Sequence, residues 1–177
     1  CFTQPGDKVI IQPPVYHPFR LVPTRMGREV VYNPLKLEDG VYKMDFEQLE
    51  SLIDKDCKML ILSNPHNPGG VVWEKEALVK LAQICSAHGI LVISDEIHAE
   101  MTYSQFRHHP FATVSEEAAA CSVTFMAPSK TFNIAGIVSS YALVPDSRIR
   151  EKFYSFLEAG ELNAGTIFAF TATKAEY

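Results

Sequence analysis

Three short polar segments contain the residue types that could do chemistry. They are residues 64–70, 95–98 and 129–133, and each follows directly after a run of apolar residues. Ligands of open α/β sheets bind beyond the carboxyl ends of the strands, so polar residues at these positions are the first candidates for a site. Each segment alone also has a simpler interpretation as a turn, a helix cap or a solvated loop. Their combination in one chain is more informative than any single segment.

An amide, a carboxylate and a lysine amine that converge at such an edge match the requirements of pyridoxal 5'-phosphate (PLP). A lysine amine holds the PLP aldehyde as a Schiff base, a carboxylate keeps the ring nitrogen protonated, and the phenolic oxygen accepts hydrogen bonds. Lys130, Asp95 and Asn67 provide these groups. Tyr16, which follows the first apolar run, is placed to stack on the ring.

The elements that must position these residues alternate along the chain. Apolar runs predict buried strands, and the stretches between them with helical spacing predict amphipathic helices. The predicted strands are 8–12, 29–32, 58–63, 90–95, 122–126 and 137–144, and the predicted helices are 44–53, 75–88 and a segment that begins near 145. This order is typical of βαβ crossovers. We therefore predict an α/β domain of three αβα layers with a mostly parallel sheet.

Cap residues support two of the helix predictions. Asp45 is available as the N-cap of the first helix, and Gly89 is a suitable C′ residue for the second. In the third helix, helical spacing places four apolar side chains on one face, namely Ile149, Phe153, Phe156 and Leu157.

Length and composition set limits on the class of protein. The chain has 177 residues, of which 47% are hydrophobic and 21% charged, enough for one core in one domain. Lys and Arg number 16 against 21 Asp and Glu, so there is no basic excess that would favour nucleic acid or an anionic membrane. The four cysteines form no CxxC pair, which fits a reducing, cytoplasmic setting. No apolar run approaches the roughly 18 residues of a membrane helix.

The motifs themselves resemble a known family. The segments NPHNPGG at 64–70, SDEIH at 94–98 and APSKTFNIAG at 127–136 are similar to those of the fold-type I PLP enzymes of the class I/II aminotransferase superfamily. Within it, the chain most resembles the MalY/PatB branch of cystathionine β-lyases. The resemblance covers essentially the whole chain. It implies that residues 1–177 are the PLP-binding large domain of a longer homodimeric enzyme, without its N-terminal arm and C-terminal small domain.

The resemblance also implies a role for each matching residue. Lys130 would hold PLP and later move the Cα proton, and Asp95 would pair with the ring nitrogen. Asn67 would bond the phenolic oxygen, and Tyr16 would stack on the ring. His98 stands where aminotransferases usually have a tyrosine that donates to the same oxygen, and an imidazole N–H can also donate there.

Two positions depart from the aminotransferase pattern. Many aminotransferases bind the PLP phosphate through a serine and an arginine, where this chain has Ala127 and Val138. Phosphate binding then depends on other groups, of which Ser129 is the nearest candidate. The absent arginine is more similar to the lyase branch. We therefore expect α,β-elimination of a sulfur amino acid such as cystathionine to a thiol, pyruvate and ammonia.

Three alternatives stay open at this point. The first is a PLP-dependent aminotransferase, because Lys130 and Asp95 serve both reactions. The second is a catalytically incompetent fragment, because the arginine that binds the substrate carboxylate in the family lies outside the chain and residues 163–165 are expected to serve a neighbouring subunit. The third is a metal-binding enzyme that uses acidic and histidine side chains, namely Asp95, Glu96, His98, Glu100, His108 and His109.

Overall fold

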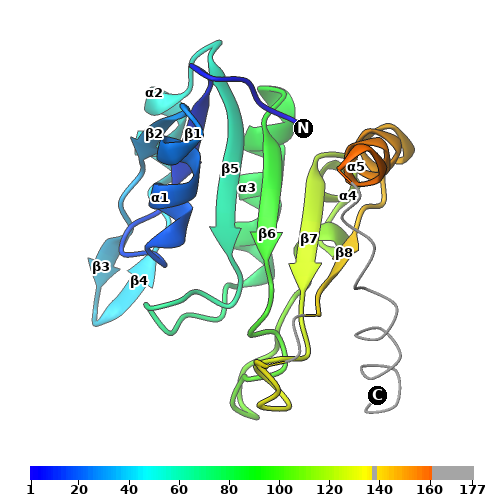
Figure 1. Ribbon diagram of the computed structural model, residues 1–177. Coiled ribbons are helices and arrows are strands. Elements are labelled where there is room, and N and C mark those ends of the chain that lie inside the picture. Colours follow the sequence, from blue (N-terminus) through cyan, green and yellow to red (C-terminus); the bar gives the residue numbers. More distant parts are fainter. Residues whose placement is uncertain (137–138, 161–177) are drawn as a thin grey trace.

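The computed structural model describes residues 1–136 and 139–160 of the chain (Figure 1). These residues form a six-stranded sheet with the order β2-β1-β5-β6-β7-β8. All neighbouring strands are parallel except β8, which runs antiparallel to β7. The strands are β1 (Lys8–Ile11), β2 (Glu29–Tyr32), β5 (Cys57–Ser63), β6 (Leu91–Asp95), β7 (Ser122–Met126) and β8 (Tyr141–Leu143). The predicted mostly parallel sheet is confirmed.

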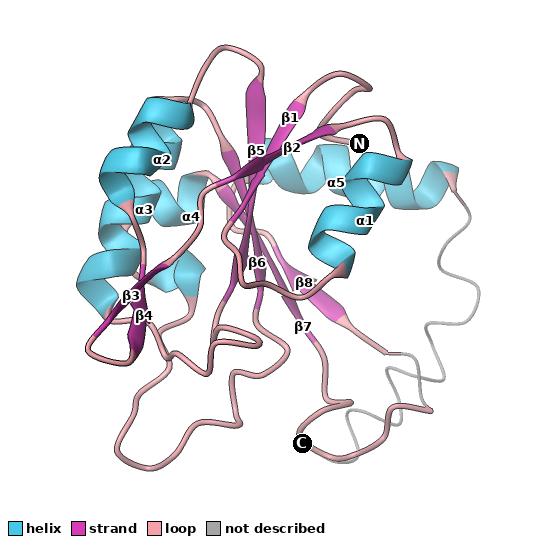
Figure 2. Cartoon of the chain, turned by 90° about the vertical axis from the view of Figure 1, so that its left-hand side faces the viewer, coloured by secondary structure: helices cyan, strands magenta, loops and turns pink. Residues whose placement is uncertain are grey.

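Helices cover both faces of this sheet, as Figure 2 shows with the sheet seen nearly edge-on. On one face lie α1 (Pro18–Arg25) and α5 (Ser147–Ala159). On the other lie α2 (Phe46–Leu52), α3 (Lys75–Ala87) and α4 (Glu116–Ala120), with the short 3-10 helix η1 (Phe111–Thr113) beside α4. A small antiparallel hairpin, β3 (Lys36–Glu38) and β4 (Val41–Lys43), completes the described elements. The fold therefore has the three predicted αβα layers.

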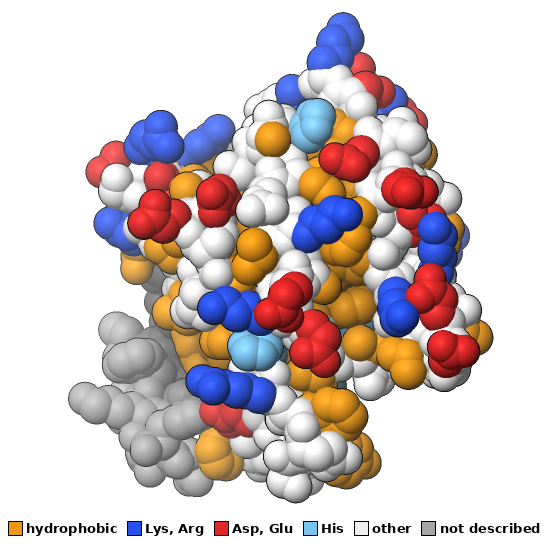
Figure 3. Space-filling model, turned by 180° about the vertical axis from the view of Figure 1, so that it is seen from behind, with side chains coloured by type: hydrophobic (Ala, Val, Ile, Leu, Met, Phe, Trp, Pro, Cys, Tyr) orange, Lys and Arg blue, Asp and Glu red, His pale blue; other side chains and the backbone are white. Residues whose placement is uncertain are grey.

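The main core lies between the sheet and the layer of α2, α3 and α4. Its fully buried side chains include Leu60 and Leu62 of β5, Leu78 and Leu81 of α3, and Val92 of β6. Burying a side chain of this size stabilises the fold by roughly 1.5–3 kcal/mol. The outer surface of the same layer has acidic and basic side chains interspersed, with hydrophobic side chains between them (Figure 3).

Local chemistry explains where the predicted helices begin and end. The Asp45 carboxylate accepts a hydrogen bond from the Gln48 N–H at 3.1 Å and thereby caps α2. Gly89 follows the C-cap of α3 with a φ of 65°, a left-handed conformation that glycine adopts without strain. Both cap predictions are confirmed.

The last two elements differ from the prediction in detail. The strand predicted at 137–144 is shorter, spans Tyr141–Leu143 and is antiparallel. In α5 none of the side chains is fully buried, and Phe156 is 51% exposed although helical spacing placed it on the apolar face. The amphipathic pattern indicated the helix correctly, but it did not indicate how much of that face the sheet covers. None of the helices among the described residues is long and apolar enough to cross a membrane.

Candidate active site

The carboxyl ends of β5, β6 and β7 bring the three polar segments to one edge of the sheet, the lower edge in Figure 1. Ser63 lies opposite Asp95 in the register of β5 and β6, and Asp95 lies opposite Phe125 in that of β6 and β7. The loops that leave these strands therefore start side by side. The sequence prediction that the segments share an edge is confirmed.

The loop that contains Asn67 is tied to the end of β5. The Asn67 N–H donates to Ser63 Oγ at 3.0 Å, and Trp73 Nε1 donates to the Ser63 carbonyl oxygen at 2.8 Å. Asn64, which is fully buried, donates its backbone N–H to the Asp95 carbonyl oxygen at 2.9 Å. These bonds fix the Asn67 loop relative to the strand end that contains Asp95.

The Asp95 carboxyl and the His98 imidazole are close enough to each other and to the Lys130 amine for their charges to interact. Burial raises the pKa of the Asp95 carboxyl, while the Ile97 N–H at 3.3 Å and the charges of His98 and Lys130 act in the opposite direction. Burial also lowers the pKa of His98, partly offset by the Asp95 charge. A partly buried carboxylate with a raised pKa favours a cationic partner, and the protonated ring nitrogen of PLP is one.

Lys130 lies in a turn directly after β7, with its side chain exposed. Three backbone hydrogen bonds close this turn: Phe132 N–H donates to the Pro128 carbonyl at 3.0 Å, Asn133 N–H to the Lys130 carbonyl at 3.4 Å, and Ile134 N–H to the Ser129 carbonyl at 3.1 Å. Ser129 itself is partly buried beside Lys130. The lysine amine is therefore accessible to a ligand on a backbone that is held locally.

Tyr16 lies immediately before α1 and is 44% exposed. Its ring meets those of His17 and Phe19 edge-on, at centroid distances of 5.1 and 6.1 Å. The segment is connected to the Asn67 loop because His66 Nε2 bonds the Pro14 carbonyl oxygen at 2.7 Å. Tyr16 thus keeps surface available for stacking while its backbone is anchored to the rest of the edge.

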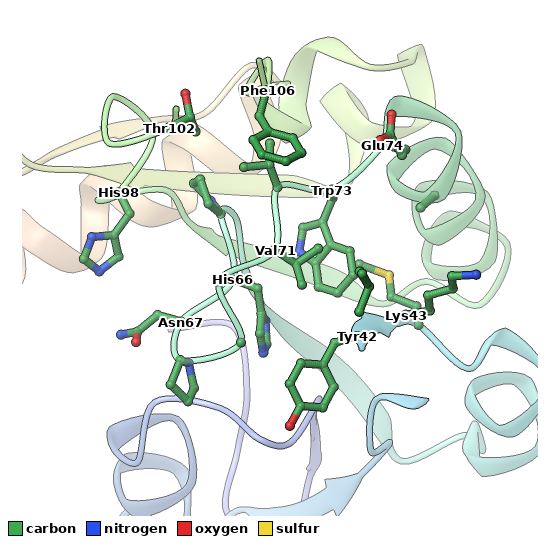
Figure 4. A pocket seen from close by; sticks show the side chains of 18 of the residues that line it. Tyr42, Lys43, His66, Asn67, Val71, Trp73, Glu74, His98, Thr102 and Phe106 are labelled. Carbon is green, nitrogen blue, oxygen red and sulfur yellow. The ribbon is translucent and has the colours of Figure 1, made fainter. Parts of the chain in front are cut away.

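A cavity of about 790 Å³ adjoins this edge, between the β3–β4 hairpin and the loops after β5 and β6. Asn67 and His98 lie on the same side of it in Figure 4, across from Tyr42 and Trp73. The other predicted site residues do not line it. Sequence reasoning missed this cavity, although the aromatic residues around the polar motifs, such as Phe106, were a signal for it.

The residues present fit PLP in their chemistry. An accessible lysine amine, a partly buried carboxylate, an amide and an imidazole gather at one edge, with an aromatic ring on a connected segment. These groups match the aldehyde, ring nitrogen, phenolic oxygen and ring face of the cofactor. Val138 and residues 163–165, for which the sequence analysis made predictions, lie outside the described residues.

The acidic and histidine residues of the metal alternative are arranged differently. Glu96 and His108 bond to each other at 2.8 Å, and the Glu96 side chain is completely buried. Among residues 1–136 and 139–160, no group of three or more His, Cys, Asp or Glu side chains is arranged to hold a metal ion. The described part of the chain therefore gives that alternative no support.

Comparison with known proteins agrees with the motifs. The chain is 47% identical over its whole length to cystathionine β-lyase PatB of Bacillus subtilis strain 168 and spans 46% of that protein. Two PLP-bound crystal structures superpose on it. One, from Clostridium difficile 630 and described as an aminotransferase, has a TM-score of 0.94 at 42% identity over 99% of this chain and 46% of its own. The other, cystalysin of Treponema denticola, has a TM-score of 0.88 at 38% identity over 97% of this chain and 44% of its own.

The chain thus spans about half the length of the relatives it matches. Its residues 1–165 match the sequence model of one family, and the fold has the same α/β architecture as PLP-bound structures. The chain belongs to the family of class I and II aminotransferases.

Proposed function

We propose that residues 1–177 form the PLP-binding large domain of a C–S β-lyase, which converts cystathionine or a related sulfur amino acid to a thiol, pyruvate and ammonia. The observation that carries the proposal is the 47% identity to cystathionine β-lyase PatB over the whole chain. The presence of Val138 where many aminotransferases have an arginine supports the lyase over its alternative.

Each site residue has one role in this proposal. PLP, when bound, supplies an electron sink for the negative charge that develops at Cα. Lys130 Nζ takes the Cα proton, and the Asp95 carboxylate keeps the ring nitrogen protonated. Asn67 and His98 donate hydrogen bonds to the phenolic oxygen, and Tyr16 packs on the ring face. Loss of the proton from Cα is followed by cleavage of the Cβ–S bond; the sulfur takes up a proton and leaves as the thiol, and water hydrolyses the remaining aminoacrylate to pyruvate and ammonia.

Ser129 is the proposed phosphate ligand in this chain. It directly precedes Lys130 and is only partly buried. A hydroxyl so close to the lysine can donate to a phosphate oxygen of a cofactor held by that lysine.

An aminotransferase is the second candidate, and the match of residues 1–165 to the class I and II aminotransferase family favours it. Lys130 and Asp95 serve both reactions, since each reaction starts by removing the Cα proton. The two reactions differ after that proton has been removed. A lyase releases pyruvate without a second substrate, whereas an aminotransferase transfers the amino group to a keto acid.

Product analysis separates the two candidates. The full-length enzyme of which residues 1–177 are the proposed large domain, and residues 1–177 alone, are each incubated with PLP and cystathionine, with and without a keto acid, and pyruvate, thiol and new amino acid are measured. The proposal predicts equal release of pyruvate and thiol without a keto acid, and none from Lys130→Ala. Amino acid formation that requires the keto acid, without pyruvate, would show the aminotransferase. Turnover by the full-length enzyme but not by residues 1–177 would show that the segment alone is incompetent, and turnover of neither kind by the full-length enzyme would contradict both candidates.

Two further predictions belong to this proposal. Because the resemblance implies a homodimer, we expect the PLP-loaded protein to elute as a dimer in size-exclusion chromatography. A cytoplasmic location is also expected and is testable by fractionation of the source cells.

A further inference from the structure

The residue next to Asp95 is a completely buried carboxylate with three hydrogen-bond donors. Glu96 Oε1 accepts from Ser94 Oγ and from the Phe111 N–H, both at 2.8 Å. Its Oε2 accepts from His108 Nε2, also at 2.8 Å. Burying an ionised carboxylate costs free energy unless hydrogen-bond donors surround it. Three donors surround the Glu96 carboxylate, so its pairing with His108 is part of a buried hydrogen-bond network and is not a surface ion pair.

The network closes the loop that contains His98. Glu96 stands at the start of this loop, while His108 and Phe111 stand at its end. The end is held a second time, because Asn64 Nδ2 donates to the His109 carbonyl oxygen at 2.9 Å. Residues 97–107 are therefore held at both ends, and His98 is the second residue of this segment.

Backbone hydrogen bonds to the ends of β5 and β7 hold the peptide group that joins Asp95 to Glu96. The Glu96 N–H donates to the Phe125 carbonyl oxygen at 2.8 Å, and the Asn64 N–H donates to the Asp95 carbonyl oxygen at 2.9 Å. The side chains of Ser94 and Glu96 bond each other, so both extend to one side of the strand end. Asp95 lies between them in sequence, and alternation places its side chain on the other side.

His108 contributes to this arrangement through one ring nitrogen. Its Nε2 donates to Glu96, whereas Nδ1 is buried and has no hydrogen-bond partner within the described part of the chain. The ring is nearly buried, with 11% of its side chain exposed. His108 therefore holds the end of the 97–107 loop through the single hydrogen bond from Nε2 to Glu96.

We propose that Glu96 and His108 are positioning residues, which set Asp95 and His98 for PLP binding by closing the 97–107 loop. The inference rests on the proposed function, because it assigns Asp95 and His98 to the cofactor. It also gives a role to Glu96 and His108, neither of which contacts PLP in the proposed function.

Matched variants of His108 test the proposal in the full chain. His108→Gln keeps a donor at the reach of Nε2, whereas His108→Leu removes it. We expect His108→Leu to weaken PLP binding by about tenfold or more and His108→Gln to stay within about threefold of wild type. Amide hydrogen exchange of the apo-protein should show faster exchange in residues 97–107 for His108→Leu only.

Two more variants separate positioning from general stability. Glu96→Gln keeps the shape of the side chain but removes its charge, and it replaces His108→Leu in the test if that variant does not fold. We expect Glu96→Gln to weaken PLP binding and to speed amide exchange in residues 97–107. The control is Ser122→Ala, a fully buried serine at the start of β7, whose Oγ donates to the Ala118 carbonyl oxygen. It should lower the melting temperature without changing PLP affinity.

The outcomes for the two proposals are distinguishable. If His108→Leu and Glu96→Gln lower the melting temperature but bind PLP as wild type does, with unchanged exchange in residues 97–107, the pair is merely structural and the inference is overturned. If the wild-type protein itself binds no PLP, the proposed function fails. In that case the exchange measurement still tests the closure of the loop.

Discussion

Ser63 and Asp95 lie opposite each other at the carboxyl ends of β5 and β6, and the hydroxyl of Ser63 accepts a hydrogen bond from the Asn67 backbone. A single strand-end serine therefore connects the strand pair that ends in the carboxylate to the loop that holds the amide. The strand register places Asp95 next to the start of the Asn67 loop, because the residues that follow parallel strands emerge at the same edge of the sheet.

Asp95→Asn should stabilise the apo-protein while it impairs PLP binding. Burial raises the pKa of Asp95, so the folded state binds this proton more tightly than the unfolded chain, whose Asp pKa is ~3.9. The carboxyl therefore costs stability as the pH rises through its folded pKa. Thermal unfolding of the apo-protein should show a higher melting temperature for Asp95→Asn at pH 7, and the same temperature for both proteins below about pH 4. A melting temperature of Asp95→Asn that exceeds that of the wild type by the same amount at every pH would contradict this explanation.

Gly69→Ala should destabilise the Asn67 loop. An added Cβ would lie 2.7 Å from His66 Cδ2 and 3.0 Å from Tyr42 Cδ2, and His66 is held by its bond to Pro14. We expect a loss of about 1–3 kcal/mol in the free energy of unfolding, measured by urea denaturation. Gly136→Ala is the matched control, since none of the described residues lies within 4 Å of its added Cβ. Equal unfolding free energies for both variants would show that the contact is not tight.

Tyr16→Ala should weaken PLP binding, whereas Tyr16→Phe should retain it. The expected loss is about 1 kcal/mol or more, because the aromatic ring provides the stacking surface and phenylalanine preserves it. Stability should change little in either variant, since the side chain is 44% exposed. Equilibrium titration of apo-protein with PLP measures the effect. Unchanged affinity in Tyr16→Ala would remove this residue from the site.

The sequence predicted the elements that have strong local signals. Apolar runs located the central strands to within a residue or so, and Asp45 and Gly89 marked helix ends because capping is a local interaction. It missed α1 and α4. The first has Pro23 in its interior and little apolar periodicity, and the second is a five-residue EEAAA segment without an apolar stripe.

In the candidate site, too, local signals were visible in the sequence and long-range contacts were not. Polar residues directly after strands were visible in the sequence, whereas the side chains that hold them were not. His66 bonds Pro14 across 52 positions and Asn64 bonds His109 across 45, so no local pattern shows either contact. Glu96 and His108 were visible as residues, but only the fold shows that they bond each other.

We expect Lys130 to hold PLP covalently. Reduction of the PLP-treated protein with borohydride, followed by peptide mass spectrometry, locates the modified lysine directly. We predict the adduct on Lys130, its loss in Lys130→Ala, and no loss in Lys58→Ala, whose amine bonds the Lys55 carbonyl oxygen away from the site. An adduct on another lysine, or equal labelling of Lys130→Ala and wild type, would contradict the account.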